Sequence, residues 1–270
     1  MVRCVICGAA GRMGKRLVAL ASEQPDVEVV GAVEHPESNA LGLDAGELAG
    51  IGKNGIAIRA DLAETLTDAD VAISFINIPA ATVEQGKICA DARKALVVGS
   101  TGLNTDEEAA FRSVIGGIPV VKASNFSVGI TVLLSLVEQA SELLGDAFDC
   151  EIIESHHTKK KDAPSGTALS LAEAAAHARG WSLADVAKHG REGIVGERPK
   201  REVGMHAVRA GDIVGHHTVL FGGTGETLEL VHRAQSRDTF AMGALRAASW
   251  VVEQRPGLYS MRDVLGLTNR

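Results

Sequence analysis

Residues that suit the handling of a small anion are concentrated between positions 154 and 167 of this 270-residue chain. Two adjacent imidazoles, His156 and His157, are followed by three lysines and then by a Pro-Ser-Gly-Thr sequence. Imidazole exchanges a proton near neutral pH more readily than any other unperturbed side chain, and an ammonium group binds a carboxylate. The segment therefore predicts a site that binds and protonates an anionic molecule.

The Pro-Ser-Gly-Thr sequence is predicted to begin a helix, because good helix formers occupy positions 168–176. The backbone N–H groups of Gly166 and Thr167 would then point toward a bound carboxylate. A nearby ammonium group adds a charge-assisted contact of roughly 1.5–3 kcal/mol, and Lys160 is our choice among the three lysines. The alternative is a solvated basic loop, which is how an isolated lysine triplet usually behaves.

Metal and disulfide chemistry are not expected in this chain. A strand over 150–157 would place His156 and His157 on opposite faces, where they cannot share a metal ion. Cys4 and Cys7 form a C-x-x-C pattern. On an extended strand, however, their Cα atoms would lie about 10 Å apart, beyond the ~7 Å reach of a disulfide. We therefore expect two separate buried thiols.

A glycine turn near the N-terminus predicts a dinucleotide site. Gly8, Gly11 and Gly14 lie between a predicted strand and a predicted helix, where missing Cβ atoms let backbone N–H groups approach a pyrophosphate. The spacing is G-x-x-G-x-x-G rather than the commoner G-x-G-x-x-G. Glu34 follows Gly14 by 20 residues, where an acidic residue accepts hydrogen bonds from an adenine ribose. The alternative is a tight connection and an ordinary surface glutamate.

The sequence allows NADH, NADPH or both as coenzyme. His35, with Arg12 and Arg16 near the turn, is able to meet a 2′-phosphate. The segments 99–102 and 123–126 are expected at the carboxyl ends of strands, where they either line a nicotinamide pocket or serve as plain strand-to-helix turns. The glycine turn and the His-Lys segment together predict a reductase that acts on an anionic substrate.

Short β-branched runs alternate with amphipathic helices from residue 2 onward. Because these strands are apolar on both faces, they predict a parallel sheet with helices on each side. The glycine-rich segment 35–60 is expected to run over the surface before a strand at 56–58. The other predicted strands are 2–7, 27–33, 71–75, 96–98 and 120–123, and the predicted helices are 12–23, 79–92 and one that begins at 104–107.

The pattern changes after a long apolar helix predicted at 129–144. Longer alternating strands follow, such as 203–208 and 218–221, and a strong helix at 240–254 is expected to return to the first domain. The predicted fold is α/β, with a Rossmann-type dinucleotide-binding domain and a second α+β domain that contains an open mixed sheet. The predicted domain boundaries are 1–127 and 238–270 for the first domain and 128–237 for the second, substrate-binding domain.

Charge and composition argue against other classes of protein. The net charge of −7 disfavours a general affinity for nucleic acid, which depends on basic groups. A hydrophobic content of 46% with only 3% aromatic residues is typical of an aliphatic α/β interior. No apolar run approaches the roughly 20 residues that span a bilayer, and the N-terminus leads directly into a strand rather than a signal peptide. We therefore expect a soluble, cytoplasmic protein with no membrane partner.

The chain resembles the 4-hydroxy-tetrahydrodipicolinate reductase family, formerly called dihydrodipicolinate reductase, of bacterial and plant lysine biosynthesis. The resemblance covers essentially the whole chain, and its most specific block runs from His156 to Thr167. The other matching segments are 8–14, 44–47, 99–102, 125–129, 209–215 and 261–265.

This resemblance implies hydride transfer from NADH or NADPH to a cyclic unsaturated dicarboxylate, and a homotetramer that forms through the sheet of the second domain. It implies that His156 is the general acid and that Lys160 is the cationic substrate contact. The expected substrate-binding residues are His157, Lys160, Ser165, Gly166 and Thr167. The expected coenzyme-binding residues are Gly8, Ala9, Ala10, Gly11, Arg12, Met13, Glu34, His35, Phe75, Gly99, Ser100, Thr101, Ala123, Ser124, Asn125 and Phe126.

The chain departs from the family pattern at two places. Family members that favour a 2′-phosphate have an arginine at the position of His35. In the family a His-Pro pair often follows the phenylalanine that matches Phe75, whereas residues 76–79 of this chain are Ile-Asn-Ile-Pro.

Two rival functions also fit the sequence. One is an aspartate-type dehydrogenase for amino or oxo dicarboxylates, and the other is a dinucleotide-sensing regulator that needs neither His156 nor Lys160.

Overall fold

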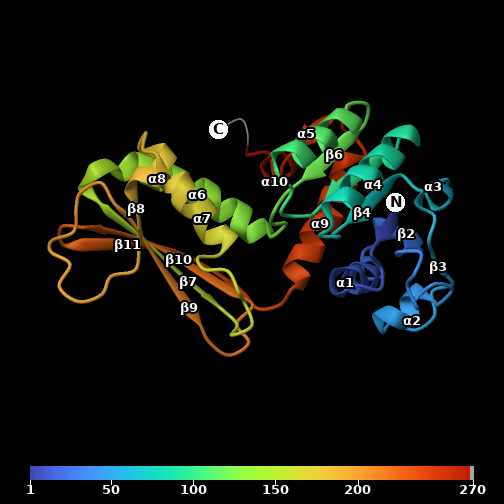
Figure 1. The fold of residues 1–270 in the computed structure, drawn as a ribbon, viewed down its shortest axis with the longest axis horizontal. Helices are drawn as coiled ribbons and strands as arrows, with labels where there is room; N and C mark the ends of the chain where they lie inside the picture. Colours follow the sequence, from blue (N-terminus) through green and yellow to red (C-terminus); the bar gives the residue numbers. More distant parts are fainter. Residues whose placement is uncertain (268–270) are drawn as a thin grey trace. The chain divides into compact units, whose positions relative to one another are not determined.

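The computed structural model describes residues 1–267 and divides into two compact units (Figure 1). The first unit comprises Met1–Val128 and Asp238–Arg270, of which 268–270 lie outside the described residues. The second unit is the continuous segment Gly129–Arg237. The first unit is therefore assembled from two parts of the chain that are distant in sequence.

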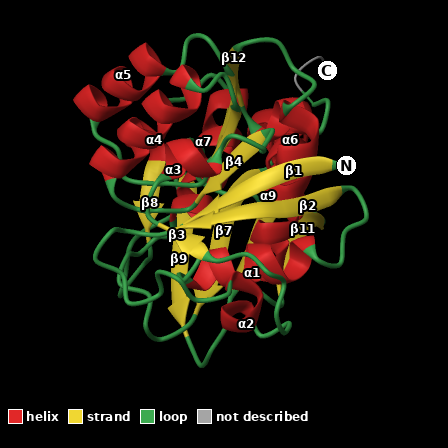
Figure 2. Ribbon diagram, turned by 90° about the vertical axis from the view of Figure 1, so that its right-hand side faces the viewer, coloured by secondary structure: helices red, strands yellow, loops and turns green. Residues whose placement is uncertain are grey.

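The first unit is built on a seven-stranded parallel sheet with the strand order β12-β6-β5-β4-β1-β2-β3. Figure 2 shows β1, β2 and β4 running side by side. The strands are β1 (Val2–Cys7), β2 (Val27–Val33), β3 (Ile58–Arg59), β4 (Val71–Ser74), β5 (Ala95–Val98), β6 (Pro119–Lys122) and β12 (Gly257–Tyr259). Its helices are α1 (Arg12–Ala21), α2 (Ala45–Ala49), α3 (Leu62–Thr65), α4 (Pro79–Asp91), α5 (Thr105–Val114), α9 (Asp238–Val251) and α10 (Met261–Val264).

Two hydrophobic cores lie on the two faces of this sheet. Successive side chains of a strand point to opposite faces, so β1 places Cys4 and Ile6 in one core and Val5 and Cys7 in the other. The first core includes residues of α1 and α9, and the second includes residues of α4 and α5. Both faces are covered, which explains the nearly unbroken apolar strands and confirms the predicted parallel sheet. Cys4 and Cys7 are separate, buried, free thiols, as expected.

The second unit contains a mixed five-stranded sheet in the order β11-β10-β7-β9-β8. β10 is antiparallel to β7 and β11, whereas β7, β9 and β8 are parallel to one another. The strands are β7 (Asp149–His156), β8 (Ala187–His189), β9 (Val203–Arg209), β10 (Gly215–Gly223) and β11 (Glu226–Ala234). The helices are α6 (Val128–Leu144), the 3-10 turn η1 (Gly145–Ala147), α7 (Gly166–Ala178) and α8 (Leu183–Val186).

One face of the mixed sheet packs against α6 and α7, whose apolar residues share a core with Cys150 and Ile152 of β7. Along each strand, residues that face this core alternate with residues that face the other side of the sheet. On that other face Ile153, Val208 and Val231 are exposed, with exposed fractions of 37%, 43% and 40%. Within the described residues this face keeps an apolar surface accessible to solvent.

Helix α6 corrects one expectation from the sequence. Together with η1 it forms a 20-residue stretch, Val128–Ala147, that is long and apolar enough by length and composition to cross a membrane. The expectation that no such run exists was wrong. The mean hydropathy over 18 residues of this stretch is 1.4, although polar residues are scattered through it. Ile130, Leu133 and Val137 pack into the core of the second unit. A core helix of this kind passes the same test of length and composition, so the stretch is weak evidence for a membrane span.

The segment 35–60 contains a short helix, α2, that the sequence pattern did not predict. The Asp44 carboxylate caps it by accepting from the Glu47 backbone N–H at 3.0 Å. The same carboxylate accepts from the N–H groups of Asn54 and Gly55, at 3.2 and 2.9 Å. Asp44 therefore ties the start of α2 to the turn at residues 54 and 55.

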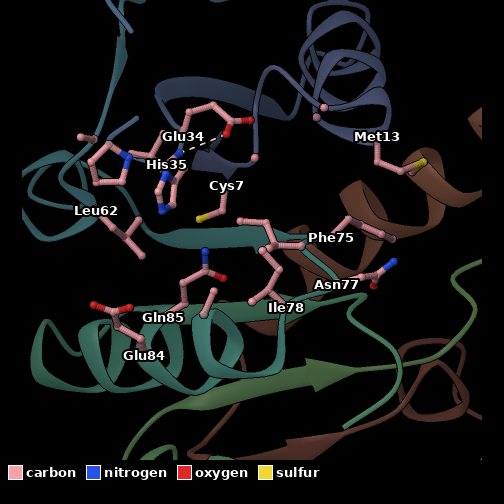
Figure 3. A pocket seen from close by; sticks show the side chains of 18 of the residues that line it. Cys7, Met13, Glu34, His35, Leu62, Phe75, Asn77, Ile78, Glu84 and Gln85 are labelled. Carbon is pink, nitrogen blue, oxygen red and sulfur yellow. Dashed lines mark hydrogen bonds between the residues drawn. The ribbon is translucent and has the colours of Figure 1, made fainter. Parts of the chain in front are cut away.

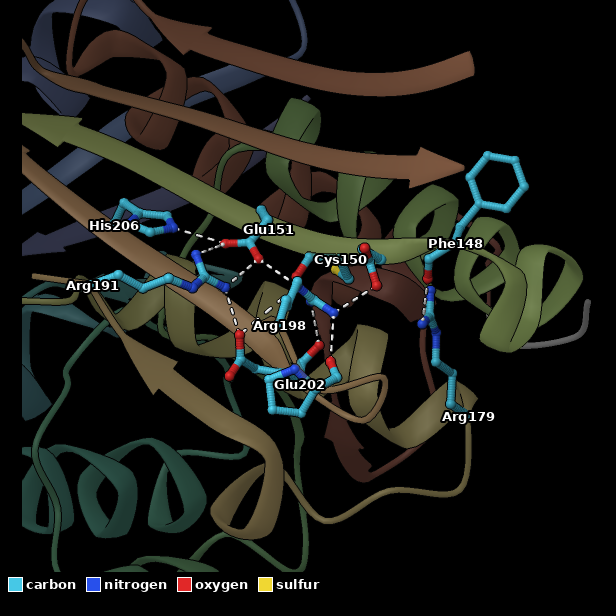
Figure 4. A network of polar contacts seen from close by, with 10 residues as sticks. Phe148, Cys150, Glu151, Arg179, Arg191, Arg198, Glu202 and His206 are labelled. Carbon is cyan, nitrogen blue, oxygen red and sulfur yellow. Dashed lines mark hydrogen bonds and ion pairs between the residues drawn. The ribbon is translucent and has the colours of Figure 1, made fainter. Parts of the chain in front are cut away.

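A network of ion pairs ties the segment 190–202 to the exposed face of the second sheet (Figure 4). Glu151 accepts two hydrogen bonds from Arg191, at 2.6 and 3.1 Å, and one from Arg198 at 2.9 Å. The His206 ring lies 2.8 Å from the same carboxylate. Arg191 also binds Glu202 at 2.5 Å. The carboxylate form of Glu151 is thus the centre of the network.

Acid should weaken this network over a defined range of pH. Burial raises the pKa of Glu151, but hydrogen bonds from Arg191, Arg198 and His206 outweigh it and lower the pKa to about 2, from 4.5 in the unfolded chain. The stabilisation is complete above pH 4.5 and is lost as the pH falls through about 2. We expect the difference in unfolding free energy between the wild type and Glu151→Gln to shrink by roughly 2 kcal/mol between pH 7 and 3 in urea titrations. If the difference in unfolding free energy stayed constant between pH 7 and 3, Glu151 would not be the ionised centre of the network.

Candidate active site

The end of β7 places two ionisable side chains at one end of the second sheet. The alternation along β7 puts Glu154 and His156 on the same side as the buried Cys150 and Ile152. Strand register brings Arg209, the last residue of β9, opposite His156. The predicted strand reached residue 157, but β7 ends at His156 and His157 begins the following loop.

Glu154 is 1% exposed and is surrounded by donors. It accepts from Nδ1 of His156 at 2.5 Å and from both terminal nitrogens of Arg209 at 2.8 and 2.9 Å. It also accepts from the Ser165 backbone N–H at 3.0 Å. Burial raises the pKa of Glu154, but these contacts outweigh it and lower the pKa below the usual value. Glu154 is therefore a buried carboxylate that stays ionised near neutral pH.

His156 is held by that carboxylate and is surrounded by positive charge. Burial lowers the pKa of His156, and the charges of Lys160 and Arg209 act in the same direction, while Glu154 opposes them. The net direction is downward. The ring of His217 lies edge-on to the His156 ring, with 5.2 Å between the ring centroids. His156 thus lies within a built arrangement of charged groups.

The loop after β7 carries the lysines and His157. Lys160 is the least exposed of the three lysines and pairs with Asp162 at 2.9 Å. Its backbone N–H donates to the His157 carbonyl at 3.1 Å, which closes a turn. The Nδ1 atom of His157 is buried and has no hydrogen-bond partner within the described part of the chain. The structure therefore brings Lys160 and His156 within electrostatic reach of each other.

Helix α7 begins as the sequence predicted. Ser165 is its N-cap, and the Ser165 Oγ accepts from the Ala168 backbone N–H at 3.2 Å. Gly166 and Thr167 are the first two residues of the helix, at the end where the helix dipole favours an anion. Nε2 of His217 lies 3.2 Å from the Ser165 Oγ. The helix start, His156 and Lys160 thus form one cluster in the second unit.

Three members of this cluster, Glu154, Arg209 and His217, were not predicted as site residues. Glu154 has a signal in the sequence, because a residue two positions before His156 on a strand shares its face. Arg209 and His217 are brought to the cluster by the pairing of β9 and β10 with β7, and they contact Glu154 and Ser165, 55 and 52 residues away, which local spacing does not reveal. Burial lowers the pKa of His217 to about 4, and the nearby His156 contributes, so this ring is neutral near pH 7. Within residues 1–267, no group of three or more His, Cys, Asp or Glu side chains is arranged to hold a metal ion.

The glycine turn of the first unit lies against a cavity of about 740 Å³ (Figure 3). Gly8 has a φ of +73°, which glycine adopts without strain. A Cβ on Gly14 would lie 2.1 Å from the Gly8 carbonyl oxygen and 2.6 Å from the Ala9 Cα. Only a residue without a side chain lets α1 begin this close to the end of β1. The turn therefore has the close backbone packing that a pyrophosphate site requires.

Seven of the expected coenzyme-binding residues line this cavity. Glu34 accepts from the Ala10 backbone N–H at 3.0 Å and from the His35 N–H at 3.1 Å. Figure 3 shows Glu84 and Gln85 of α4 across the cavity from Glu34 and His35. The seven expected lining residues are Gly8, Gly11, Arg12, Met13, Glu34, His35 and Phe75.

One face of α4 lines the cavity and was missed in the sequence. Ala81, Glu84, Gln85 and Ile88 have the i, i+3, i+4, i+7 spacing of a single helix face. This spacing is visible in the sequence. The face mixes polar and apolar residues, however, as an ordinary exposed helix face does. Oε1 of Gln85 is buried and has no hydrogen-bond partner within residues 1–267. An acceptor in this position fits an exocyclic amine such as that of adenine.

The expected residues after β5 and β6 lie at the carboxyl edge of the sheet but do not line the cavity. The Ser100 hydroxyl donates to the Ile76 carbonyl at 2.5 Å, which joins this loop to the loop after β4. The Phe75 and Phe126 rings lie 5.3 Å apart. A Cβ on Gly99 would lie 2.3 Å from the Phe75 ring, so Gly99 makes room for that ring. The expected residues outside the cavity are Ala9, Ala10, Gly99, Ser100, Thr101, Ala123, Ser124, Asn125 and Phe126.

The residues of the first unit fit an adenine dinucleotide. The glycine turn offers a cradle that a Cβ would fill, the start of α1 favours a phosphate, and Gln85 offers an unpaired acceptor. The acidic Glu34 stands at the end of β2, where a ribose hydroxyl donates in such sites.

Comparisons with known proteins agree across the whole chain. Residues 2–126 match the family model described as dihydrodipicolinate reductase, N-terminus, and residues 129–265 match the C-terminus of the same family. A 4-hydroxy-tetrahydrodipicolinate reductase of Syntrophus aciditrophicus is 47% identical over 98% of this chain and 99% of its own. One of Halorhodospira halophila is 50% identical over 97% and 98%. The fold is similar to that of a dipicolinate-bound dihydrodipicolinate reductase from Paenisporosarcina sp., with a TM-score of 0.74, 23% identity, and 96% and 97% of the two chains covered.

Proposed function

The chain belongs to the dihydrodipicolinate reductase family, and we propose that its first unit binds the coenzyme while its second unit binds and protonates the substrate. The enzyme uses NADH or NADPH to reduce 4-hydroxy-tetrahydrodipicolinate, by way of dihydrodipicolinate, to tetrahydrodipicolinate. This reaction belongs to diaminopimelate and lysine biosynthesis. The observation that supports the assignment most strongly is the cluster of His156, Lys160 and the start of α7 at one end of the second sheet.

The substrate is a doubly negative ring, and the cluster offers matching groups. Lys160 and the first turn of α7, with Ser165, Gly166 and Thr167, bind its carboxylates. His157 provides a further contact from the same loop. These groups hold the ring with its reducible bond beside His156, and such positioning is worth up to about 7–11 kcal/mol of the barrier.

The coenzyme supplies hydride, and His156 supplies the proton. Addition of hydride to the C=C bond conjugated with the ring imine leaves an enamine, and Nε2 of protonated His156 gives its proton to the enamine carbon. The neutral imidazole then takes a proton from water, which restores the acid. A general acid of this kind contributes about 10²–10⁴-fold to the rate.

The coenzyme is held by the glycine turn and by the loops after β4, β5 and β6. The turn residues Gly8 to Met13 would hold the pyrophosphate, and Glu34 would accept a hydrogen bond from the adenine ribose. His35 and Arg12 tolerate a 2′-phosphate. The segments 99–101 and 123–126, together with Phe75, form the edge of the nicotinamide site.

The exposed face of the second sheet suits self-association. Ile153, Val208 and Val231 present an apolar surface that a soluble protein rarely leaves uncovered. Copies of this chain cover one another there in a homotetramer, since closed symmetric assemblies are the common solution for such faces. The enzyme works in the cytoplasm, and neither a membrane nor a nucleic acid is among its partners.

Turnover of the cyclic substrate tests the function. Purified full-length protein is mixed with freshly generated cyclic substrate, and the loss of reduced-coenzyme absorbance is followed with NADH and with NADPH. We expect oxidation of both, with kcat/KM values within about tenfold, because Glu34 suits a free ribose and His35 tolerates a phosphate. Turnover only of aspartate with oxidised coenzyme would support the dehydrogenase rival. NADH binding without any turnover would support the regulator.

A further inference from the structure

We propose that Glu154 is a positioning residue of the reduction: it fixes the His156 tautomer so that Nε2 exchanges the proton, and it ties that ring to the start of the carboxylate-binding helix. This inference rests on the proposed function and adds a residue to it. It concerns the buried carboxylate that meets Nδ1 of His156, the Arg209 guanidinium and the Ser165 backbone N–H.

The ionised state of Glu154 determines which nitrogen of His156 is protonated. An ionised carboxylate only accepts hydrogen bonds, so the proton of the 2.5 Å contact belongs to Nδ1. In a histidine, the hydrogen bond of one ring nitrogen sets the protonation of the other. Nε2 is therefore the nitrogen that gains and loses the exchangeable proton.

The side of the ring that carries Nε2 is kept open by Gly215. A Cβ at Gly215 would lie 3.1 Å from Nε2 of His156, which is tighter than an ordinary contact. The first residue of β10 thus passes close to the imidazole without a side chain that would crowd it. Nδ1 is thus bound to Glu154, while Nε2 is not crowded by a side chain from the start of β10.

Glu154 also balances the charge around the ring. The ionisable groups that face His156 are Glu154, Lys160, Arg209 and His217, and of these four only Glu154 is negative. His217 is neutral near pH 7 because its burial lowers its pKa to about 4. Asp162 pairs with Lys160 rather than with the ring, so without the Glu154 carboxylate the ring would have no bound anion beside Lys160 and Arg209, and its protonated form would be disfavoured.

The same carboxylate links the proton donor to the substrate cradle. Its Oε2 atom meets His156 and its Oε1 atom meets the N–H of Ser165, the N-cap of α7. His217 contacts the Ser165 hydroxyl at 3.2 Å. Glu154 therefore fixes the distance between the ring that donates the proton and the helix start that receives the carboxylate.

The test compares Glu154→Gln with Glu151→Gln. Both glutamates lie on β7 and bind arginines, but Glu151 points to the opposite face and does not contact His156. For Glu154→Gln we expect the high-pH limb of the kcat/KM profile to shift down by about one pH unit or more, with kcat at pH 8 reduced about tenfold or more. For Glu151→Gln the limb should stay at its wild-type position. A Glu154→Gln enzyme with the wild-type profile would overturn the proposal.

A second measurement needs no substitution of Glu154 and remains decisive if that variant does not fold. Nitrogen-15 spectra of the histidine rings report the protonated nitrogen, and His156 is assigned by its absence from His156→Gln. We expect the neutral His156 ring to carry its proton on Nδ1. A proton on Nε2 of the neutral ring would overturn the proposal even in an active enzyme, whereas an inactive wild-type enzyme with the Nδ1 proton would contradict only the proposed function.

Discussion

Replacing His156 with glutamine is expected to lower kcat by about 10²–10⁴-fold and to leave KM nearly unchanged. Glutamine keeps a polar amide of similar size in place of the ring, while the acidic proton is lost. Steady-state rates with the cyclic substrate at saturating coenzyme provide the measurement. This variant removes a group that acts mainly in the transition state.

Two further variants make the His156 result specific. Lys160→Met removes a charge that holds the substrate, so its KM should rise together with a fall in kcat. His177→Gln changes an exposed histidine of α7 and should keep wild-type kinetics. If His156→Gln kept the wild-type kcat, His156 would not be the proton donor.

Replacing Gly14 with alanine is expected to lower kcat/KM for the coenzyme by about 100-fold or more. The new Cβ would lie 2.1 Å from the Gly8 carbonyl oxygen and 2.6 Å from the Ala9 Cα, so the backbone of the turn must move. A displacement of about 1 Å in a positioning element costs about 10²-fold. The measurement is the coenzyme dependence of the rate, together with the fluorescence of bound NADH.

The control for Gly14 is Gly117→Ala, because a Cβ at Gly117 meets no atom within 4 Å. Circular dichroism through thermal unfolding separates a local change in the turn from a loss of fold. A Gly14→Ala enzyme that binds NADH as the wild type does would show that the turn does not hold the coenzyme.

Much of the fold was predictable because its longer elements have strong local signals. Apolar runs such as 71–74 and 95–98 are buried on both faces, which is the pattern of a parallel sheet. The Asn104 capping box marks the start of α5 in the sequence as it does in the structure. The short elements α2, α8 and β12 were missed, since three to five residues have little periodicity and depend on tertiary contacts.

The site was predictable where its groups are adjacent in sequence. His156, Lys160 and Ser165 fall within ten residues, and the structure places them in one cluster. Arg209 and His217 lie more than 50 residues from their partners and join through strand register alone. Glu154 and the cavity face of α4 had the correct periodicity, but nothing in the sequence distinguishes a buried glutamate from a surface one.

The return of α9 to the first unit has a consequence for biosynthesis on the ribosome. Arg16 of α1 pairs with Asp238 across 222 residues, and β12 adds to β6 only after the whole second unit has been made. The second unit, residues 129–237, leaves the ribosome as one continuous stretch. The first sheet, in contrast, has one apolar face uncovered until α9 has been synthesised. Such late, non-local closure slows maturation and leaves that face as the place where a chaperone would act during translation.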